Sequence, residues 1–163
     1  MERIESFRID HEHLLAGVYV SRVDHVGDQT VTTYDLRLRR PYLDTPLSGA
    51  EAHTLEHLGA TWLRNNPDIK TRVIYFGPMG CLTGFYMILA GEPDAKEAAE
   101  IARGMFSFIA DYEGAIPGAT RIECGNCDFQ DLESARASAR LYHDEVLLNI
   151  TPERLSYPST SEN

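Results

Sequence analysis

The sequence predicts an α+β fold, a single domain in which a roughly four-stranded antiparallel sheet is packed with helices. Three observations predict it: strand-like segments occur in two pairs, each pair is joined by a tight turn, and three longer segments have the apolar periodicity of helices. With 163 residues, of which 43% are hydrophobic, the chain is long enough to bury one core. We expect one domain over residues 1–150 and a polar, flexible tail over 151–163.

The first pair of strands covers residues 18–26, VYVSRVDHV, and residues 30–40, TVTTYDLRLRR, with Gly27 and Asp28 as the turn between them. Apolar and charged residues alternate along the second strand, which gives it an apolar face and a polar face. The two faces carry Tyr34, Leu36 and Leu38, and Asp35, Arg37 and Arg39, respectively. Arg37 is either a fixed cation that anchors a carboxylate or hydroxyl group, or an ordinary solvated strand residue.

A proline-containing loop over residues 40–49 ends before a helix over about 49–65. The core side of this helix is formed by Leu55, Leu58, Trp62 and Leu63. The positions recur at the spacing of one helical face, so we expect this face to pack against the sheet.

The second pair of strands covers residues 71–77, TRVIYFG, and 82–91, LTGFYMILAG, around the tight connection GPMGC. A long helix is expected from about Pro93 to Tyr112. An irregular connection then leads to Asp131, which can cap a last helix that runs to about residue 149.

Charge and composition exclude several classes of function. A net charge of −10 argues against binding to nucleic acid, because neutralising phosphates needs basic clusters. No apolar run approaches the roughly 20 residues of a membrane span, and the N-terminal MERIESFRID lacks the apolar core of a signal peptide. With three cysteines and no signal, we expect a reducing, cytoplasmic environment.

The stretch AHTLEHLGA places His53 and His57 one helical turn apart, with Glu56 directly before the second histidine. Both imidazoles can then face one metal ion from a single helix. This H-x-x-E-H order reverses the common metalloprotease signature and occurs in inverted zinc peptidases. Two histidines at this spacing are equally common as solvated side chains, so the motif alone leaves the metal site open.

A third ligand is available in the segment ECGNC, where Cys124 and Cys127 lie in a glycine-containing loop. Taken alone, the C-x-x-C pair also fits a redox couple or half of a structural zinc site, although no second C-x-x-C completes such a site. Cys81, in GPMGCLTG, sits on a turn from which it can reach a cleft. A nearby cation would favour its thiolate, whereas a small buried hydrophobe is the commoner role of a cysteine.

Six short blocks, in this order and spacing, resemble the S-ribosylhomocysteine lyases, the LuxS family of bacteria. They are ESFRIDH (5–11), YDLRLRRP (34–41), HTLEHL (53–58), GPMGCLTGFY (77–86), AGEP (90–93) and ECGN (123–126). The resemblance implies cleavage of S-ribosyl-L-homocysteine to L-homocysteine and 4,5-dihydroxy-2,3-pentanedione, the precursor of autoinducer-2. The implied route is carbonyl migration through enediolates followed by β-elimination.

The resemblance also implies a homodimer with active sites at the subunit interface and one divalent metal ion per subunit, Fe²⁺ with Zn²⁺ or Co²⁺ as alternatives. By motif position, the implied metal ligands are His53, His57 and Cys124. Glu56 and Cys81 fall at the positions of the acid–base pair. The implied substrate contacts are Ser6, His11 and Arg37.

The sequence departs from the family pattern at two places. Family members often carry an acidic residue in a D-I-S-P-M-G-C run, where this chain has Tyr75 and Gly77. After ECGN, Cys127 is introduced and Gln130 replaces a histidine; Cys127 is therefore a possible competitor for the ion. The alternative function is a zinc hydrolase of the reversed H-x-x-E-H type, which would leave Cys81 without a use.

Overall fold

The computed structural model describes residues 7–158. Its strands and helices follow one another as β1 Gly17–Val26, β2 Gln29–Arg37, α1 Gly49–Asn65, β3 Val73–Pro78, β4 Gly84–Ala90, α2 Ala95–Ala110 and α3 Leu132–Glu145. Two 3-10 turns, Leu147–Asn149 and Pro152–Arg154, come after α3. These elements form one α+β domain, which confirms the predicted fold class.

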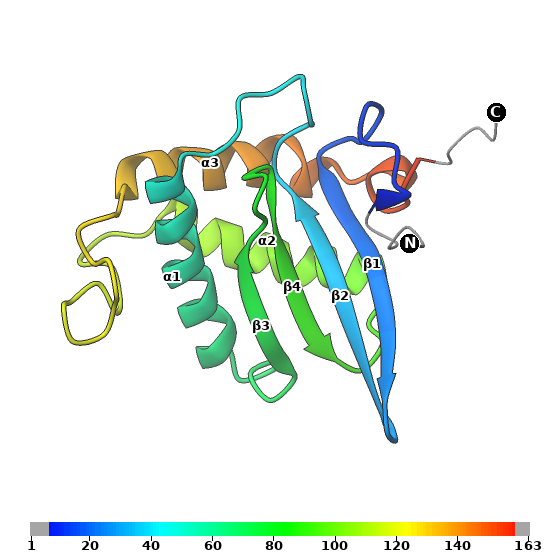
Figure 1. Cartoon of the computed structure of the whole chain (residues 1–163), viewed down its shortest axis with the longest axis horizontal. Helices are drawn as coiled ribbons and strands as arrows, with labels where there is room; N and C mark the ends of the chain where they lie inside the picture. The colour runs from blue at the N-terminus through cyan, green and yellow to red at the C-terminus, as the bar shows by residue number, and fades with distance from the viewer. Residues whose placement is uncertain (1–6, 159–163) are drawn as a thin grey trace.

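The sheet has the strand order β1-β2-β4-β3, and every neighbouring pair is antiparallel. The β1–β2 turn places Gly27 at a φ of 61°, which glycine adopts without strain. Figure 1 shows α2 behind the sheet, α1 beside β3, and α3 across one end of the strands. Within residues 7–158 the helices therefore gather on one side of the sheet.

Each helix begins at a side-chain cap. Ser48 and Glu51 form a capping box at α1, in which each side chain accepts the backbone N–H of the other at 3.1 Å. Asp94 caps α2, and Asp131 caps α3 as predicted. The bounds of α1 agree with the prediction, whereas α3 ends at Glu145 and the last predicted turn is a separate 3-10 turn.

The core lies between the inner face of the sheet and the helices. The largest fully buried apolar side chains come from both layers and include Leu36, Leu55, Leu58, Phe85, Met87, Leu89, Met105 and Phe106. Phe76 and Phe85 stack with ring centroids 5.0 Å apart, which fills the space beneath α1. Across the described part of the chain, none of the helices has the length and apolar character needed to cross a bilayer.

The polar face of β2 is buried at the end of the strand, where Asp35 and Arg37 have only 1% and 3% of their surface exposed. Of the two sequence interpretations of Arg37, the solvated strand residue is therefore excluded. A buried guanidinium needs a buried partner, since an isolated charge away from water costs several kcal/mol. Asp35 is that partner, two residues earlier on the same face of the strand.

β2 ends at Arg37, three residues earlier than the sequence indicated. The N–H groups of Leu38 and Arg39 both donate to the Thr83 carbonyl, at 3.0 and 2.9 Å. This shared acceptor turns the chain away from the ladder with β4. The turn is consequential for the site, because it brings the end of β2 against the segment that carries Cys81.

The chain after residue 150 packs against the sheet as far as the structure describes it. The ring of Tyr157 stacks on Tyr19, with centroids 4.7 Å apart and an interplanar angle of 11°. Its hydroxyl group donates to the Asp35 carboxylate at 3.1 Å. Residues 159–163 of the expected tail lie outside the described residues. The segment that we expected to be a tail thus contributes a side chain to the buried end of β2.

Truncation of Leu89 to alanine tests the core. Leu89 on β4 is fully buried, so Leu89→Ala should lower the free energy of unfolding by about 2–5 kcal/mol through lost burial and a cavity. Urea unfolding measures this change. Leu148→Ala is the matched control, because Leu148 is 55% exposed and its truncation should cost no more than about 0.5 kcal/mol. Equal losses in both variants would contradict the assigned core.

Candidate metal centre and reactive cysteine

His53 and His57 project from α1 toward one point. Their Nε2 atoms lie 3.0 Å apart, and the two rings meet edge to face with centroids 4.6 Å apart. The four-residue spacing accounts for this convergence, because positions four apart lie on one face of a helix.

Backbone carbonyls hold the opposite nitrogen of each ring. His53 Nδ1 lies 2.7 Å from the Phe129 carbonyl, and His57 Nδ1 lies 2.7 Å from the Pro117 carbonyl. A carbonyl oxygen only accepts, so both Nδ1 atoms carry the proton and both Nε2 atoms present a lone pair. At Gly118, where φ is +69°, a Cβ atom would lie 3.3 Å from His57 Nδ1; this glycine lets the loop approach the ring.

Cys124 completes the group. Its Sγ lies 3.5 Å from His53 Nε2, and the ligand atoms of His53, His57 and Cys124 all lie within 4.8 Å of one another. The Asn126 N–H donates to the same sulfur at 3.4 Å. Two imidazoles and one thiolate suit Zn²⁺ or Fe²⁺ and leave a fourth position for another ligand. The residues therefore fit a divalent metal ion.

Cys127 does not belong to this group as the described residues are arranged, and its Sγ lies 3.8 Å from the Asp128 carboxylate. Gln130, at the position where the family pattern has a histidine, lies beside the centre instead. Its Oε1 accepts the Thr54 hydroxyl at 2.7 Å, and its Nε2 lies 3.2 Å from His53 Nδ1. Gln130 thus helps to hold the loop after Cys124 against α1.

Glu56 directly precedes His57 on α1 and is half-buried. Within residues 7–158 its carboxylate makes no hydrogen bond or ion pair in the structure. A carboxylate next to a metal ligand and without an internal partner is free to exchange a proton with a bound molecule.

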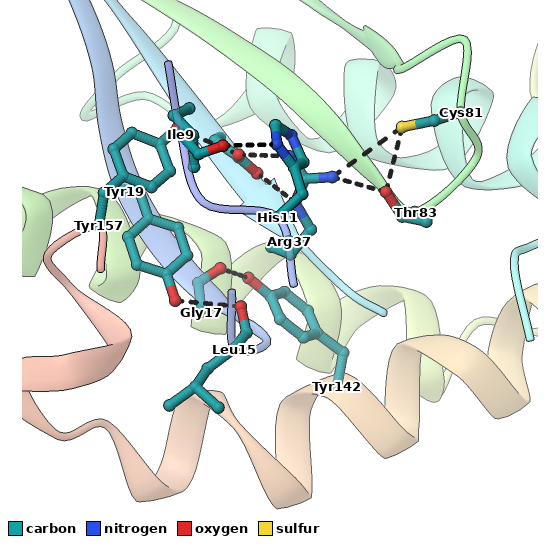
Figure 2. A network of polar contacts seen from close by, with 11 residues as sticks. Ile9, His11, Leu15, Gly17, Tyr19, Arg37, Cys81, Thr83, Tyr142 and Tyr157 are labelled. Carbon is teal, nitrogen blue, oxygen red and sulfur yellow. Dashed lines mark hydrogen bonds and ion pairs between the residues drawn. The ribbon is translucent and has the colours of Figure 1, made fainter. Parts of the chain in front are cut away.

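Cys81 lies on the turn between β3 and β4, and its side chain is exposed. The turn is closed by a hydrogen bond from the Leu82 N–H to the Met79 carbonyl at 2.9 Å. Figure 2 shows that the Cys81 sulfur points toward Thr83 and Arg37. The sulfur is 3.1 Å from Thr83 Oγ1 and 3.9 Å from Arg37 Nη1.

The surroundings of Cys81 favour its thiolate. Partial burial raises the pKa of the Cys81 thiol, but the hydrogen bonds from Thr83 and the charge of Arg37 outweigh burial and lower the pKa below the usual range. A reactive cysteine needs a nearby cation, and Arg37 is that cation.

Two of the predicted substrate contacts remain, His11 and Ser6. His11 is half-buried near the Arg37 side chain, and its Nδ1 bonds the Ile9 carbonyl at 2.9 Å (Figure 2). Ser6 lies outside the described residues.

Tyr75 and Gly77 stand in the run where the family pattern has an acid. The Tyr75 ring lies over Gly77, so that a Cβ atom at Gly77 would be 2.1 Å from the tyrosine oxygen. No acidic group takes this place on β3.

The structure therefore forms two separate groups, one around His53, His57 and Cys124 and one around Arg37 and Cys81. No hydrogen bond or ion pair joins them within residues 7–158. Sequence reasoning missed the carbonyls of Pro117 and Phe129, as well as Asp35, Thr83 and Tyr157 in the second group. The sequence signal for the second group was weak. It consisted of the alternation that puts Asp35 and Arg37 on one face of the strand and of the position of Thr83 in GPMGCLTG.

The fold and the site together define a small α+β protein with a His₂Cys group that can hold a divalent metal ion and a second group built around a cysteine. The chain matches the family model S-Ribosylhomocysteinase (LuxS) over residues 4–153. This protein belongs to that family, and the family's curated relatives are lyases. The resemblance seen in the sequence and the predicted enzymatic nature of the chain are thereby confirmed.

The chain is similar to several curated proteins named S-ribosylhomocysteine lyase. It is 52% identical to the one from Desulfotalea psychrophila, over 98% of this chain and all of the relative. It is 46% identical to the one from Clostridium beijerinckii, over 98% of this chain and all of the relative. The Porphyromonas gingivalis protein is 45% identical over 97% of this chain and 99% of its own length.

Metal content tests the ligand set. Cys124→Ser removes the only sulfur within the group, so the affinity for Zn²⁺ or Co²⁺ should fall at least tenfold, since even changes behind the ligands cost 10–100-fold. Competition with a chelator measures the affinity. Cys127→Ser is the matched control and should bind as the wild type does. Loss of affinity in Cys127→Ser with retention in Cys124→Ser would transfer the ligand role to Cys127.

Proposed function

We propose that this protein cleaves S-ribosyl-L-homocysteine to L-homocysteine and 4,5-dihydroxy-2,3-pentanedione, the precursor of the quorum-sensing signal autoinducer-2. The observation that carries the proposal is the His₂Cys group, with Glu56 beside it, in a chain similar over 98% of its length to a protein named for this activity. A hydrolase of the reversed H-x-x-E-H type would leave the arrangement of Cys81, Thr83 and Arg37 unused.

The residues that would hold the metal ion are His53, His57 and Cys124, one ion per subunit. Fe²⁺ is the expected metal, with Zn²⁺ and Co²⁺ as alternatives, because an N₂S donor set accepts all three. When bound, such an ion supplies a Lewis acid that stabilises negative charge developing on substrate oxygen.

The chemistry requires proton transfers at carbon before the thiol can leave. The thioether of the substrate is unactivated, so the carbonyl must first migrate along the sugar from C1 to C2 to C3. Each migration removes a proton from a carbon next to the carbonyl and returns a proton to the neighbouring carbon, through an enediolate. With the ketone at C3, removal of the C4 proton breaks the C5–S bond, and a proton on sulfur completes release of homocysteine.

Cys81 and Glu56 are the proposed proton carriers. The lowered pKa of Cys81 favours a thiolate on the turn near Arg37, which suits removal of protons from carbon. Glu56, next to His57, suits transfers among hydroxyl groups and the elimination step. Positioned general acids and bases each contribute about 10²–10⁴-fold to rate.

Arg37, His11 and Ser6 are the proposed substrate contacts. The homocysteine end of the substrate is a zwitterion and the sugar carries hydroxyl groups, both of which need fixed polar partners. Arg37 is well suited because Asp35 holds its guanidinium through two hydrogen bonds, at 3.1 and 2.6 Å. The charge is therefore placed before substrate arrives and does not have to be ordered on binding.

We further propose a homodimer with the active sites at the subunit interface, in a reducing cytoplasm. The sheet face opposite the helices supports the dimer, because it presents Ile88 paired with Tyr75, and Tyr75 is 45% exposed. An apolar sheet face is stable when another layer covers it. The separation of the metal group from Cys81 within one chain is consistent with sites completed at an interface.

Free cysteines at positions 81, 124 and 127 support the proposed reducing compartment.

Thiol release tests the reaction. The protein loaded with Fe²⁺ or Co²⁺ under anaerobic conditions should release free thiol from S-ribosylhomocysteine. Glu56→Gln should keep its metal and lose about 10²–10⁴-fold in rate, because an amide cannot act as a general acid or base as a carboxyl group does. Glu100→Gln, on the exposed side of α2, is the matched control and should keep full activity. Absence of thiol from the loaded wild type would refute the proposed function.

A charge on the open sheet face tests the dimer. Ile88→Glu should lower the dimerisation constant by more than about a hundredfold, since an unpaired buried charge costs 3–5 kcal/mol and each 1.4 kcal/mol is tenfold. Sedimentation measures the mass, and circular dichroism confirms that the chain remains folded. Leu141→Glu, on the exposed face of α3, should leave the mass unchanged. A folded Ile88→Glu of wild-type mass would remove this face from the interface.

A further inference from the structure

Tyr157 lies near the end of the described chain, yet its hydroxyl group reaches the buried end of β2. The 3-10 turn Pro152–Arg154 leads the chain to this place, and the stack on Tyr19 fixes the plane of the Tyr157 ring. The hydroxyl donates to Asp35 Oδ2 at 3.1 Å. Figure 2 shows Tyr157 and Tyr19 together on one side of the Arg37 side chain, with Cys81 and Thr83 on the other.

Asp35 holds Arg37 in a bidentate ion pair. Arg37 Nε donates to Oδ1 at 3.1 Å and Nη2 donates to Oδ2 at 2.6 Å. Both side chains are almost fully buried. A buried pair of this kind is stable only when its remaining polar atoms also have partners. The Tyr157 hydroxyl supplies an additional donor on the Asp35 carboxylate, and Thr83 supplies an acceptor for Arg37.

The free end of the guanidinium faces Cys81. Arg37 Nη1 donates to Thr83 Oγ1 at 2.6 Å and lies 3.9 Å from the Cys81 sulfur. Because the Thr83 oxygen already accepts from Arg37, its own hydrogen is free to donate to the sulfur, 3.1 Å away. Both contacts place positive polarity toward Cys81.

We propose that Tyr157 is a positioning residue for Cys81: its hydroxyl holds Asp35, Asp35 holds Arg37, and Arg37 with Thr83 faces the Cys81 sulfur. The C-terminal segment thereby takes part in activating a cysteine that lies 76 positions earlier in the chain. The inference deepens the proposed function and rests on Cys81 as a proton carrier. Tyr157 acts only through its neighbours and contacts none of the proposed reacting groups.

The charges predict how loss of the Tyr157 hydroxyl would change thiolate formation at Cys81. Asp35 accepts two hydrogen bonds from Arg37 in the ion pair, at 3.1 and 2.6 Å, and a third from the Tyr157 hydroxyl. The hydroxyl also takes up part of the carboxylate's negative charge. Without it, Asp35 would offset more of the positive charge that Arg37 presents to Cys81, and the thiolate would become harder to form. The other titratable groups that act on Asp35, Arg37 or the tyrosines beside them are His11, Tyr19, Arg22, Tyr86, Tyr142 and Arg154.

The decisive variant is Tyr157→Phe in the full-length protein, which keeps the ring and its stack on Tyr19 and removes only the hydroxyl. The readout is the rate at which iodoacetamide alkylates Cys81, followed by mass spectrometry of the peptide that contains it, as a function of pH. The pH midpoint should move upward, and below the midpoint the rate should fall about two- to tenfold, the worth of one hydrogen bond. Metal loading and substrate do not enter this measurement.

Two further variants serve as the positive and the negative control. Thr83→Val removes the hydroxyl that touches the sulfur itself and should raise the midpoint at least as far, which shows that the readout responds. Tyr112→Phe is the matched control, because the Tyr112 hydroxyl bonds the Ala115 carbonyl at 2.7 Å and takes no part in this network; its midpoint should equal that of the wild type. A Tyr157→Phe midpoint that is unchanged or lowered, beside a raised Thr83→Val midpoint, overturns the proposal.

Steady-state kinetics separates this inference from the proposed function. If both hold, kcat of Tyr157→Phe for thiol release falls by the same two- to tenfold, recovers as pH rises, and KM changes less than kcat. If the wild type releases no thiol while the alkylation midpoint still moves, the proposed function fails and the positioning role of Tyr157 stands. A merely structural role of Tyr157 would lower stability without moving the midpoint, and that outcome also overturns the proposal.

Discussion

The buried ion pair of Asp35 and Arg37 is the interaction on which the group around Cys81, the end of the sheet and the C-terminal segment depend. Two opposite charges with almost no exposed surface are tolerable only if each remaining polar atom finds a partner. The partners come from distant parts of the chain: Thr83 from the segment after the β3–β4 turn and Tyr157 from the C-terminal segment. Satisfying one ion pair therefore holds the end of the sheet, the cysteine turn and the C-terminal segment in one arrangement.

The metal centre is organised by a different constraint, the need to present lone pairs of fixed orientation. α1 supplies His53 and His57 on one face, but a helix alone does not decide which nitrogen of each ring points inward. The connection between α2 and α3 decides it, because its carbonyls at Pro117 and Phe129 accept from Nδ1. The same connection carries Cys124, so one loop both orients the helix ligands and adds the third.

The two groups suit opposite chemical demands. In the proposed reaction, a metal ion held by the His₂Cys group would stabilise negative charge on oxygen, whereas Arg37 and Thr83 would stabilise negative charge on the sulfur of Cys81. In the described chain no hydrogen bond or ion pair links the two groups. The proposed interface between subunits would be a means of bringing the two groups to one substrate.

The sequence by itself determined what depends on near neighbours: the bounds of α1, the two hairpins, the Asp131 cap and the placement of His53 and His57 on one helical face. These follow from periodicity and spacing, which act over a few residues. Only the tertiary structure decided that Arg37 is buried and that Tyr157 reaches Asp35, a contact between residues 122 positions apart. No local pattern encodes such a contact, because the partner of a buried charge is chosen by which distant segments the packed core brings together.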